Sequence, residues 1–393
     1  MRMARVLTEV VLASSLIGGS FASVAFHAVN AVPGRAAAGA SCSTASVVGR
    51  RLGVKTSSVS TPASPNGIVS TADGQWSFSW LSNGQLGVFS DGRRGLVLTH
   101  TVPMPATAGV NQLTLTQDGQ YLLAASGYGA LVVSVARAER GNRRAVIGAL
   151  SAKSQAGSVP PFAINVAVQG IWVFVSVEFA REVAVFNLRS ALAADFRTSG
   201  LVGTIPIGGL AVGLALSPDG RWLYATSEGT GPNGTNPGAV SVINAATAER
   251  SPAKALVATA PAEACGTVRD VVSADGATLW VTARDSNQLI AFSTSKLRDT
   301  PERARVAAVP VGRAPVGLAL AANGARVITA DELSNGLTVV DTAAALASKP
   351  AVLGTVAAGM TPRDITVDPH QRAVLVTNRQ SRQVEAVPLA QLP

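Results

Sequence analysis

One fourteen-residue pattern returns seven times along this 393-residue chain, and it limits the possible folds more than any other feature. A clear copy is LALSPDGRWLYATS at residues 214–227, in which two apolar runs flank an Asp-Gly turn. The turn glycine recurs at Gly74, Gly119, Gly170, Gly220, Gly276 and Gly324, with Gln371 at this position in the seventh copy. Successive copies lie 45 to 56 residues apart. So regular a repeat predicts one structural unit built seven times.

Each copy predicts a β-hairpin. Asp-Gly supplies the positive φ angles of a tight turn, and the flanking apolar runs are short enough to be strands. Third and fourth strand-like segments follow, such as AVSVINA at 239–245 and LVGTIPIGG at 201–209. Only 14% of the residues are charged while 47% are hydrophobic, which favours strands and turns over solvent-exposed helices. The sequence therefore predicts an all-β fold: a seven-bladed β-propeller of four-stranded antiparallel blades over residues 41–393.

The last repeat stops short of a fourth strand. The strand-like segment ASVVGRRLGV, Ala45 to Val54, has no place in the other repeats. We therefore expect it to complete the seventh blade and to join the two ends of the ring, which leaves no open blade edge. On this prediction, deletion of residues 41–56 unfolds or aggregates the protein.

Residues 1–40 have the pattern of a secretory signal peptide. Arg2 and Arg5 precede a mostly apolar run from Val10 to Phe26, and small residues follow. An uncleaved N-terminal anchor is the alternative, although the run is short for a membrane span. Either way we expect an exported protein, whether extracellular, periplasmic or attached to the cell envelope, with no transmembrane span in the mature chain.

The second strands resemble those of the YVTN-repeat family of β-propellers. The matching segments are LYATS at 223–227, LWVTA at 279–283 and VLVTN at 374–378, together with SPDG at 217–220 and IPIGG at 205–209. The resemblance covers about residues 45–393. It implies the propeller fold, and relatives of this architecture include propellers similar to 6-phosphogluconolactonase. The roles it implies range from lactone hydrolysis to surface attachment, so function must be argued from a site.

The default ligand site of a propeller is the face that surrounds the central funnel. The loops between second and third strands lie on this funnel face, as do the loops that lead from one blade into the next. The candidate ligand-binding residues predicted at this rim are Asn111, Glu178, Arg181, Glu228, Arg269, Asp270, Arg284, Asp331, Arg363, Asp364, Asn378 and Arg379. Arginines among carboxylates could bind a carboxylate or a sugar. The favoured alternative is that they form ion pairs that fix neighbouring blades, because structural ion-pair networks resemble functional clusters.

Several classes of chemistry lack their usual residues. Of the three histidines, His27 lies in the signal segment, His100 in a fourth strand and His370 in a turn away from the funnel, so a His-dependent triad is not expected. No spacing of metal ligands occurs, and we expect no metal and no cofactor. GTGPNG at 229–234 lies between two strands, so it does not form a dinucleotide site. We predict no catalytic residue.

Two functions remain open from the sequence. The first is a monomeric, non-catalytic binding module whose funnel face holds a protein, a glycan or another envelope polymer. The second is an enzyme, a lactonase-like hydrolase whose substrate is a small lactone. The net charge of +9 is spread over scattered arginines, so a nucleic-acid partner is not expected. The predicted topology places Cys42 at the outer start of the closing strand and Cys265 in a loop across the ring, so we expect no disulfide between them.

Overall fold

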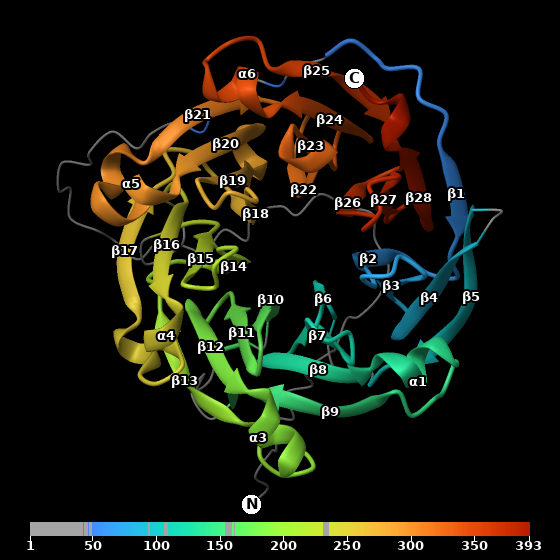
Figure 1. The fold of residues 1–393 in the computed structure, drawn as a ribbon, viewed down its shortest axis with the longest axis vertical. Helices are drawn as coiled ribbons and strands as arrows, with labels where there is room; N and C mark the ends of the chain where they lie inside the picture. Colours follow the sequence, from blue (N-terminus) through green and yellow to red (C-terminus); the bar gives the residue numbers. More distant parts are fainter. Residues whose placement is uncertain are drawn as a thin grey trace, which may run out of the picture. The chain divides into compact units, whose positions relative to one another are not determined.

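The structure is a computed structural model that describes residues 42, 46, 49–92, 95–105, 109–153, 159–160, 162–230 and 236–393. Internal contacts divide the chain into Met1–Gly39 and Ala40–Pro393. The expected signal peptide, residues 1–40, lies outside the described residues. In the second unit seven four-stranded antiparallel sheets follow one another around a ring (Figure 1). The predicted seven-bladed β-propeller is confirmed.

The strands of the first four blades follow in chain order from the inner to the outer edge. Blade 1 consists of β2 (Pro65–Ser70), β3 (Trp76–Leu81), β4 (Gln85–Gly92) and β5 (Gly95–Pro103). Blade 2 consists of β6 (Leu113–Leu115), β7 (Tyr121–Ser126), β8 (Gly129–Ser134) and β9 (Val146–Ser151). Blade 3 consists of β10 (Ala163–Gln169), β11 (Trp172–Val177), β12 (Glu182–Asn187) and β13 (Leu201–Pro206). Blade 4 consists of β14 (Ala211–Leu216), β15 (Trp222–Ser227), β16 (Ala239–Asn244) and β17 (Leu256–Pro261).

The last three blades complete the ring. Blade 5 consists of β18 (Thr267–Val272), β19 (Thr278–Ala283), β20 (Gln288–Ser293) and β21 (Arg305–Pro310). Blade 6 consists of β22 (Pro315–Ala321), β23 (Arg326–Asp331), β24 (Gly336–Asp341) and β25 (Val352–Ala357). Blade 7 takes β26 (Pro362–Val367), β27 (Ala373–Asn378) and β28 (Gln383–Pro388) from the C-terminal end of the chain and β1 (Ser57–Ser60) from its N-terminal part.

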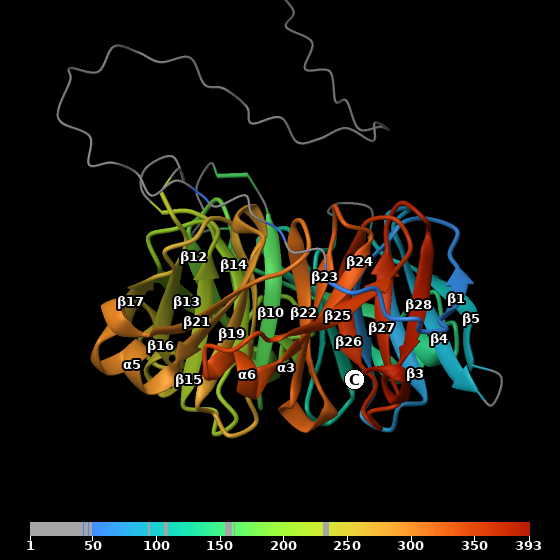
Figure 2. The ribbon, with the colours of Figure 1, turned by 90° about the horizontal axis from the view of Figure 1, so that it is seen from above.

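Short helices follow the third strands of blades 2 to 6. They are α1 (Val135–Glu139), α3 (Leu188–Ala193), α4 (Ala245–Ala248), α5 (Thr294–Asp299) and α6 (Thr342–Leu346). Five 3₁₀ turns are also present among the described residues: η1 (Pro252–Lys254), η2 (Arg284–Ser286), η3 (Pro301–Arg303), η4 (Ala322–Gly324) and η5 (Leu389–Gln391). The side view shows α3, α5 and α6 toward the lower side of the propeller (Figure 2). In an antiparallel blade this is the side of the turns between first and second strands, opposite the funnel face.

The core lies between neighbouring blades. Phe174, Val183 and Ile205 of blade 3, for example, form one buried cluster with Leu214 and Leu223 of blade 4. Both faces of the middle strands are therefore buried, which explains why they read as almost continuous apolar runs.

The seventh blade is closed by an N-terminal strand, as predicted, but by a different segment. The closing strand is β1, Ser57–Ser60, which pairs antiparallel with β28 from Ser57 opposite Ala386 to Ser60 opposite Gln383. The predicted segment, 45–54, is only partly described. Its residues 50–52 run parallel to the outer strand of blade 6, where Arg51 bridges Thr355 and Leu52 N–H donates to the Thr355 carbonyl at 2.7 Å. Figure 1 shows this blue segment outside β25, before it reaches β1.

The prediction that the two cysteines stay unpaired is wrong. Cys42 and Cys265 form a disulfide, with their Cα atoms 5.6 Å apart. The expectation assumed that Cys42 begins the closing strand at blade 7. Instead the chain first passes the outer edge of blade 6, so Cys42 lies farther back along the ring, beside the loop that leads into blade 5.

The Asp-Gly turns stabilise themselves. In blade 4 the Asp219 carboxylate accepts a hydrogen bond from the Ser217 hydroxyl at 2.5 Å and another from the Arg221 N–H at 3.1 Å. These bonds lower the pKa of Asp219. Asp73, Asp118 and Asp275 make the same pair of contacts in blades 1, 2 and 5. The repeated aspartate is therefore a turn-capping residue.

The threonine of the second strand connects neighbouring blades. Thr226 Oγ1 accepts a hydrogen bond from Gly213 N–H in its own blade at 2.7 Å and donates to the Val268 carbonyl of the next blade at 3.2 Å. Ser176 and Thr282 form the same link from blades 3 and 5 to their next blades. This geometry explains why the YVTN-like segments LYATS and LWVTA carry a hydroxyl at that position.

Candidate functional site

The funnel face carries a cluster of opposite charges, which we call the funnel-face charged cluster. Its members are Glu178, Glu228, Arg284, Glu332, Arg363 and Arg379. All except Arg363 follow the second strand of a blade, where the loop to the third strand begins, and Arg363 lies near the start of β26. The antiparallel order of the strands brings these positions to the same face. Five of the six are among the candidate ligand-binding residues predicted from the sequence.

Ion pairs in the charged cluster connect neighbouring blades. Arg284 of blade 5 pairs with Glu228 of blade 4, and its Nε lies 2.9 Å from Oδ1 of Asp285. Arg363 of blade 7 contacts both carboxylate oxygens of Glu332 of blade 6, at 3.1 and 3.2 Å. Arg379 lies 3.9 Å from the same carboxylate. Paired charges at this face thus help to hold adjacent blades in position.

Glu178 is the unusual member of the charged cluster. Its side chain is buried, and no hydrogen bond or ion pair reaches its carboxylate from any part of the chain that the structure describes. Burial, together with the nearby Glu228 carboxylate, raises the pKa of Glu178 to about 7, although Arg284 and Arg363 act in the opposite direction. Near neutral pH this carboxyl can therefore either hold or release a proton.

The raised pKa predicts a pH-dependent cost to stability. In the unfolded chain Glu178 ionises near its ordinary pKa of 4.5, whereas in the folded protein it does so only near 7. The folded state consequently binds more protons between these values, and its stability falls as pH rises through that window. We expect Glu178→Gln to increase the free energy of unfolding by about 1 kcal/mol at pH 5 and about 3 kcal/mol at pH 8.

Urea unfolding at the two pH values measures this difference. Glu302→Gln, which changes an exposed carboxylate on η3, is the matched control and should show little effect at either pH. If the Glu178→Gln gain were equal at pH 5 and pH 8, the carboxyl would be ionised in the folded protein throughout this range.

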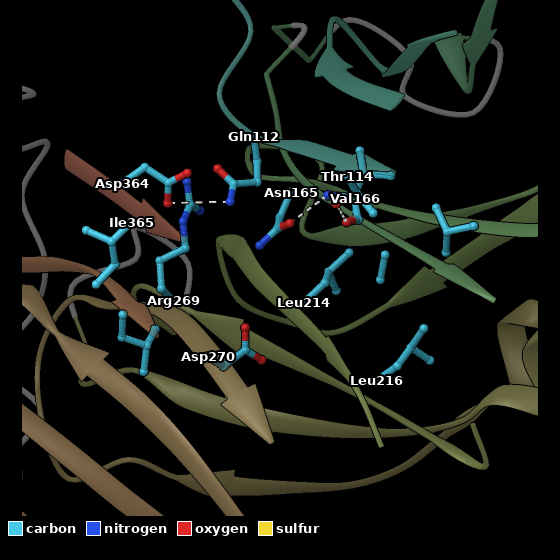
Figure 3. Close-up of a pocket in the computed structure, with 13 residues that line it drawn as sticks. Gln112, Thr114, Asn165, Val166, Leu214, Leu216, Arg269, Asp270, Asp364 and Ile365 are labelled. Atoms are coloured by element: carbon cyan, nitrogen blue, oxygen red, sulfur yellow. Dashed lines mark hydrogen bonds between the residues drawn. The ribbon is translucent and has the colours of Figure 1, made fainter. Parts of the chain in front are cut away.

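A second group of predicted residues lies inside the central channel. Arg269, Asp270 and Asp364 line a cavity of about 280 Å³ together with Gln112 and Asn165 (Figure 3). Arg269 and Asp364 are 7% and 4% exposed. Figure 3 shows the Arg269 guanidinium directed toward the Asp364 carboxylate. Asp364 also accepts hydrogen bonds from Ile68 N–H at 2.9 Å and from Gln112 Nε2 at 3.5 Å.

The channel residues occupy one repeated position. The third residue of each inner-strand segment is Gly67, Gln112, Asn165, Gly213, Arg269, Gly317 or Asp364 in blades 1 to 7. Where this residue is glycine the neighbouring inner strand comes close: a Cβ at Gly317 would lie 2.9 Å from the Arg363 carbonyl oxygen. Where it is polar, the side chain lines the cavity. Gln112 and Asn165 were missed from the sequence, although this repeated position would have identified them.

Over part of the channel, a cluster of apolar side chains lies between the funnel-face charged cluster and the polar residues that line the cavity. Ile164, Val212, Val268 and Val316 occupy the second position of the inner strands, one residue nearer the funnel face, and pack together in a buried cluster. None of these four lines the cavity, whose lining continues instead to Val168 and Leu216 at the opposite ends of their strands. Arg269, Asp270 and Asp364 therefore belong to the channel and not to the exposed rim.

The remaining predicted rim residues mainly form hydrogen bonds with backbone groups or with neighbouring side chains. Asn111 Nδ2 donates to the Ala163 carbonyl at 2.9 Å, and Asn378 Nδ2 donates to Glu385 at 2.6 Å. Asp331 accepts hydrogen bonds from Thr329 and Thr338, while burial raises the pKa of Asp331 to about 7. Arg181 lies in the loop after Glu178, with a positive φ of 56°.

The two histidines in the described residues lie where the sequence placed them, away from the funnel. Nε2 of His100 on β5 lies 2.9 Å from the Ala138 carbonyl, and Nε2 of His370 lies 2.9 Å from the Asp73 carbonyl. Over the described ranges, no group of three or more His, Cys, Asp and Glu side chains could hold a metal ion. None of the helices in that part of the chain has the length and apolar character needed to cross a membrane.

Comparison with known proteins establishes the fold and nothing finer. No protein-family model matches the sequence, and none of the curated proteins does. A chain in the structure titled Kuenenia stuttgartiensis hydrazine synthase is similar with a TM-score of 0.66 and 16% identity, over 84% of this chain and 97% of that one. A chain in a crystal structure of the mitotic checkpoint complex gives 0.67 and 11%, over 94% and 99%. Sequence identities this low carry no function from one propeller to another.

Proposed function

We propose that this propeller is an exported, monomeric binding module of the YVTN-repeat type that holds a protein partner on its funnel face. The observation that carries the proposal is the combination of charged and exposed apolar side chains there. Of nine large apolar side chains exposed in the described residues, four lie in funnel-face loops: Phe162, Phe179, Leu333 and Met360. None of these four residues was predicted from the sequence.

The aromatic pair is the centre of this apolar surface. Phe162 and Phe179 are 42% and 43% exposed, and their ring centroids lie 5.4 Å apart. Phe179 is the direct neighbour of Glu178 in the charged cluster. Exposed aromatic side chains beside paired charges are typical of protein-binding surfaces, where aromatic residues and arginine supply most of the affinity.

The disulfide supports export. Disulfides persist in oxidising compartments outside the cytoplasm and are rare in reducing ones. A bond between Cys42 and Cys265 therefore agrees with a secreted or envelope protein. It adds independent support to the signal peptide expected over residues 1–40.

The test begins with a partner identified by cross-linking in the native cell envelope and then purified for direct binding. Phe162→Ser and Phe179→Ser should each weaken its affinity at least about 10-fold, as expected for exposed aromatic anchors. Val257→Ser is the matched control, because Val257 is 52% exposed on the outer strand β17, away from the funnel face. Unchanged affinity in both phenylalanine variants, with loss in the Val257 variant, would place the partner on the outer edge and contradict the proposal.

Glu178 favours one alternative, a lactonase-like hydrolase. A carboxyl with a pKa near 7 is suited to accept a proton from attacking water, and Arg284 and Arg363 could polarise a lactone carbonyl. In that case a small lactone should be hydrolysed with kcat/KM rising through pH 7, and Glu178→Gln should remove most of the turnover. A purified protein that turns over none of a broad lactone panel rejects this alternative and leaves the binding module.

A further inference from the structure

One position of the inner strands breaks the sevenfold pattern. The fourth residue is aliphatic in six blades and acidic in blade 5. In order around the ring these residues are Ile68, Leu113, Val166, Leu214, Asp270, Leu318 and Ile365. Asp270 therefore carries a carboxyl group at a position that the fold otherwise fills with hydrocarbon. An isolated buried carboxylate is costly, so a departure of this kind indicates a use for the charge.

The neighbouring blade leaves room for the Asp270 carboxyl. Gly213 faces it from β14, and a Cβ at that glycine would lie 2.5 Å from Oδ1 of Asp270. Neither carboxyl oxygen of Asp270 has a hydrogen-bond partner in the described residues. Burial holds the pKa of Asp270 well above its usual range, and Arg269 only partly offsets this effect. The group is thus accommodated sterically but has no counter-ion of its own.

The charges that line the channel cavity do not balance. Arg269 is the single cationic side chain among the lining residues, against the two carboxyl groups of Asp270 and Asp364. Figure 3 shows Arg269 directed toward Asp364 and the Asp270 carboxyl turned away from both. Arg269 Nε and Gln112 Oε1 are also buried without partners in the described chain. The cavity therefore has unused acceptor atoms on Asp270 and Gln112 and one unused donor on Arg269, and it lacks one positive charge whenever both carboxyls are ionised.

Apart from the polar side chains of Thr114 and Asn165, the rest of the lining is apolar. Val166, Val168, Leu214, Leu216 and Leu318 continue from the polar end of the cavity toward the face of the Asp-Gly turns. A molecule that entered from that face would meet hydrocarbon first and charge last. This order suits a ligand with a compact cationic head and a short hydrocarbon chain.

We propose that the channel cavity is a second ligand site, which binds a small primary ammonium with a short aliphatic chain as the counter-ion of Asp270. An ammonium group carries three N–H donors and one positive charge, which are the features that the cavity lacks. The aliphatic chain packs against the leucines of the lining. This site is separate from the funnel face, so its occupation does not depend on the function proposed for that face.

Titration calorimetry with n-butylammonium chloride tests the proposal on the purified full chain. Wild-type protein should bind one equivalent, and tetramethylammonium and sodium should bind at least about 10-fold more weakly, because they donate no hydrogen bond. Asp270→Asn and Asp270→Leu should each weaken butylammonium binding at least about 10-fold. Asp299→Asn, which changes an exposed carboxylate at the end of α5 in the same blade, should bind like wild type.

Melting temperatures distinguish a lost site from a damaged fold. Without amine, Asp270→Leu should melt a few degrees higher than wild type, because it restores the aliphatic residue of the other blades. Butylammonium should raise the melting temperature of wild type and of Asp299→Asn but not of either Asp270 variant. Absence of saturable butylammonium binding to wild type overturns the proposal. So does equal binding to the Asp270 variants, or sodium binding as strong as that of the amine.

Discussion

A chain that begins at Thr61 is expected to be about 3–5 kcal/mol less stable than one that begins at Thr56, and to aggregate, because it lacks the closing strand β1. Four residues of β1 pair with β28, and Val59 packs on the small apolar cluster at the junction of blades 7 and 1. Each lost backbone hydrogen bond contributes about 1 kcal/mol, and burial of one valine contributes a similar or larger amount. Removing β1 also leaves β28 as an open edge that other chains can pair with.

The matched control is a chain that begins at Thr56. It keeps β1 but lacks the disulfide and the segment 50–55 that follows the edge of blade 6. The difference between the two truncations in urea unfolding, together with light scattering, measures the closing strand alone. Equal stability and equal solubility of the two would show that the ring does not need β1. The sequence predicted that deletion of residues 41–56 would unfold or aggregate the protein. That deletion is close to the Thr56 control, because the closing strand β1 begins only at Ser57.

Replacing Cys265 by serine is expected to lower the free energy of unfolding by about 2–4 kcal/mol, which is typical for loss of a native disulfide. The bond connects residues 223 positions apart. Closing so long a loop restricts the unfolded chain strongly, and the chain-entropy relation gives about 5 kcal/mol as an upper figure. The bond also fixes the chain ahead of segment 50–55 and β1, so its loss should weaken ring closure as well.

Three comparisons check that the effect comes from the bond itself. Cys42→Ser and the double variant should match Cys265→Ser in urea unfolding, since either change removes the same link. A thiol reductant should lower wild type to the level of the variants and leave the variants unchanged. If reductant had no effect on wild type while Cys265→Ser was destabilised, the loss would come from packing around residue 265.

Much of the fold could be read from the sequence because its signals are local. The Asp-Gly turn, the alternation of large and small residues and the hydroxyl of the second strand all lie within fourteen residues, and each satisfies a neighbouring group. Asp219 caps its own turn, and Thr226 connects its own inner strand to the next one. The seventh repeat also lacks a strand, which predicted that an N-terminal segment closes the ring.

Prediction of the candidate site was less complete. Residues in loops after second strands were placed correctly on the funnel face, because strand order alone brings Glu178, Glu228 and Arg284 together. Strand order does not say how deep in the channel a residue lies, so Arg269, Asp270 and Asp364 were assigned to the rim. The exposed pair Phe162 and Phe179 was not predicted, because apolar residues next to strands are normally expected to be buried in the core.

Turn chemistry and strand periodicity repeat along the chain, so the sequence alone predicts the number of blades, their four-stranded plan and the face on which each loop lies. Three features appear only in the folded ring: Ser57–Ser60 closes blade 7, Cys42 bonds to Cys265, and the Asp270 carboxyl is buried without a counter-ion. Each of these depends on residues far apart in the chain that meet only when the ring closes. The distances between these residues depend on the geometry of the whole ring, so they cannot be predicted from the sequence of any single repeat.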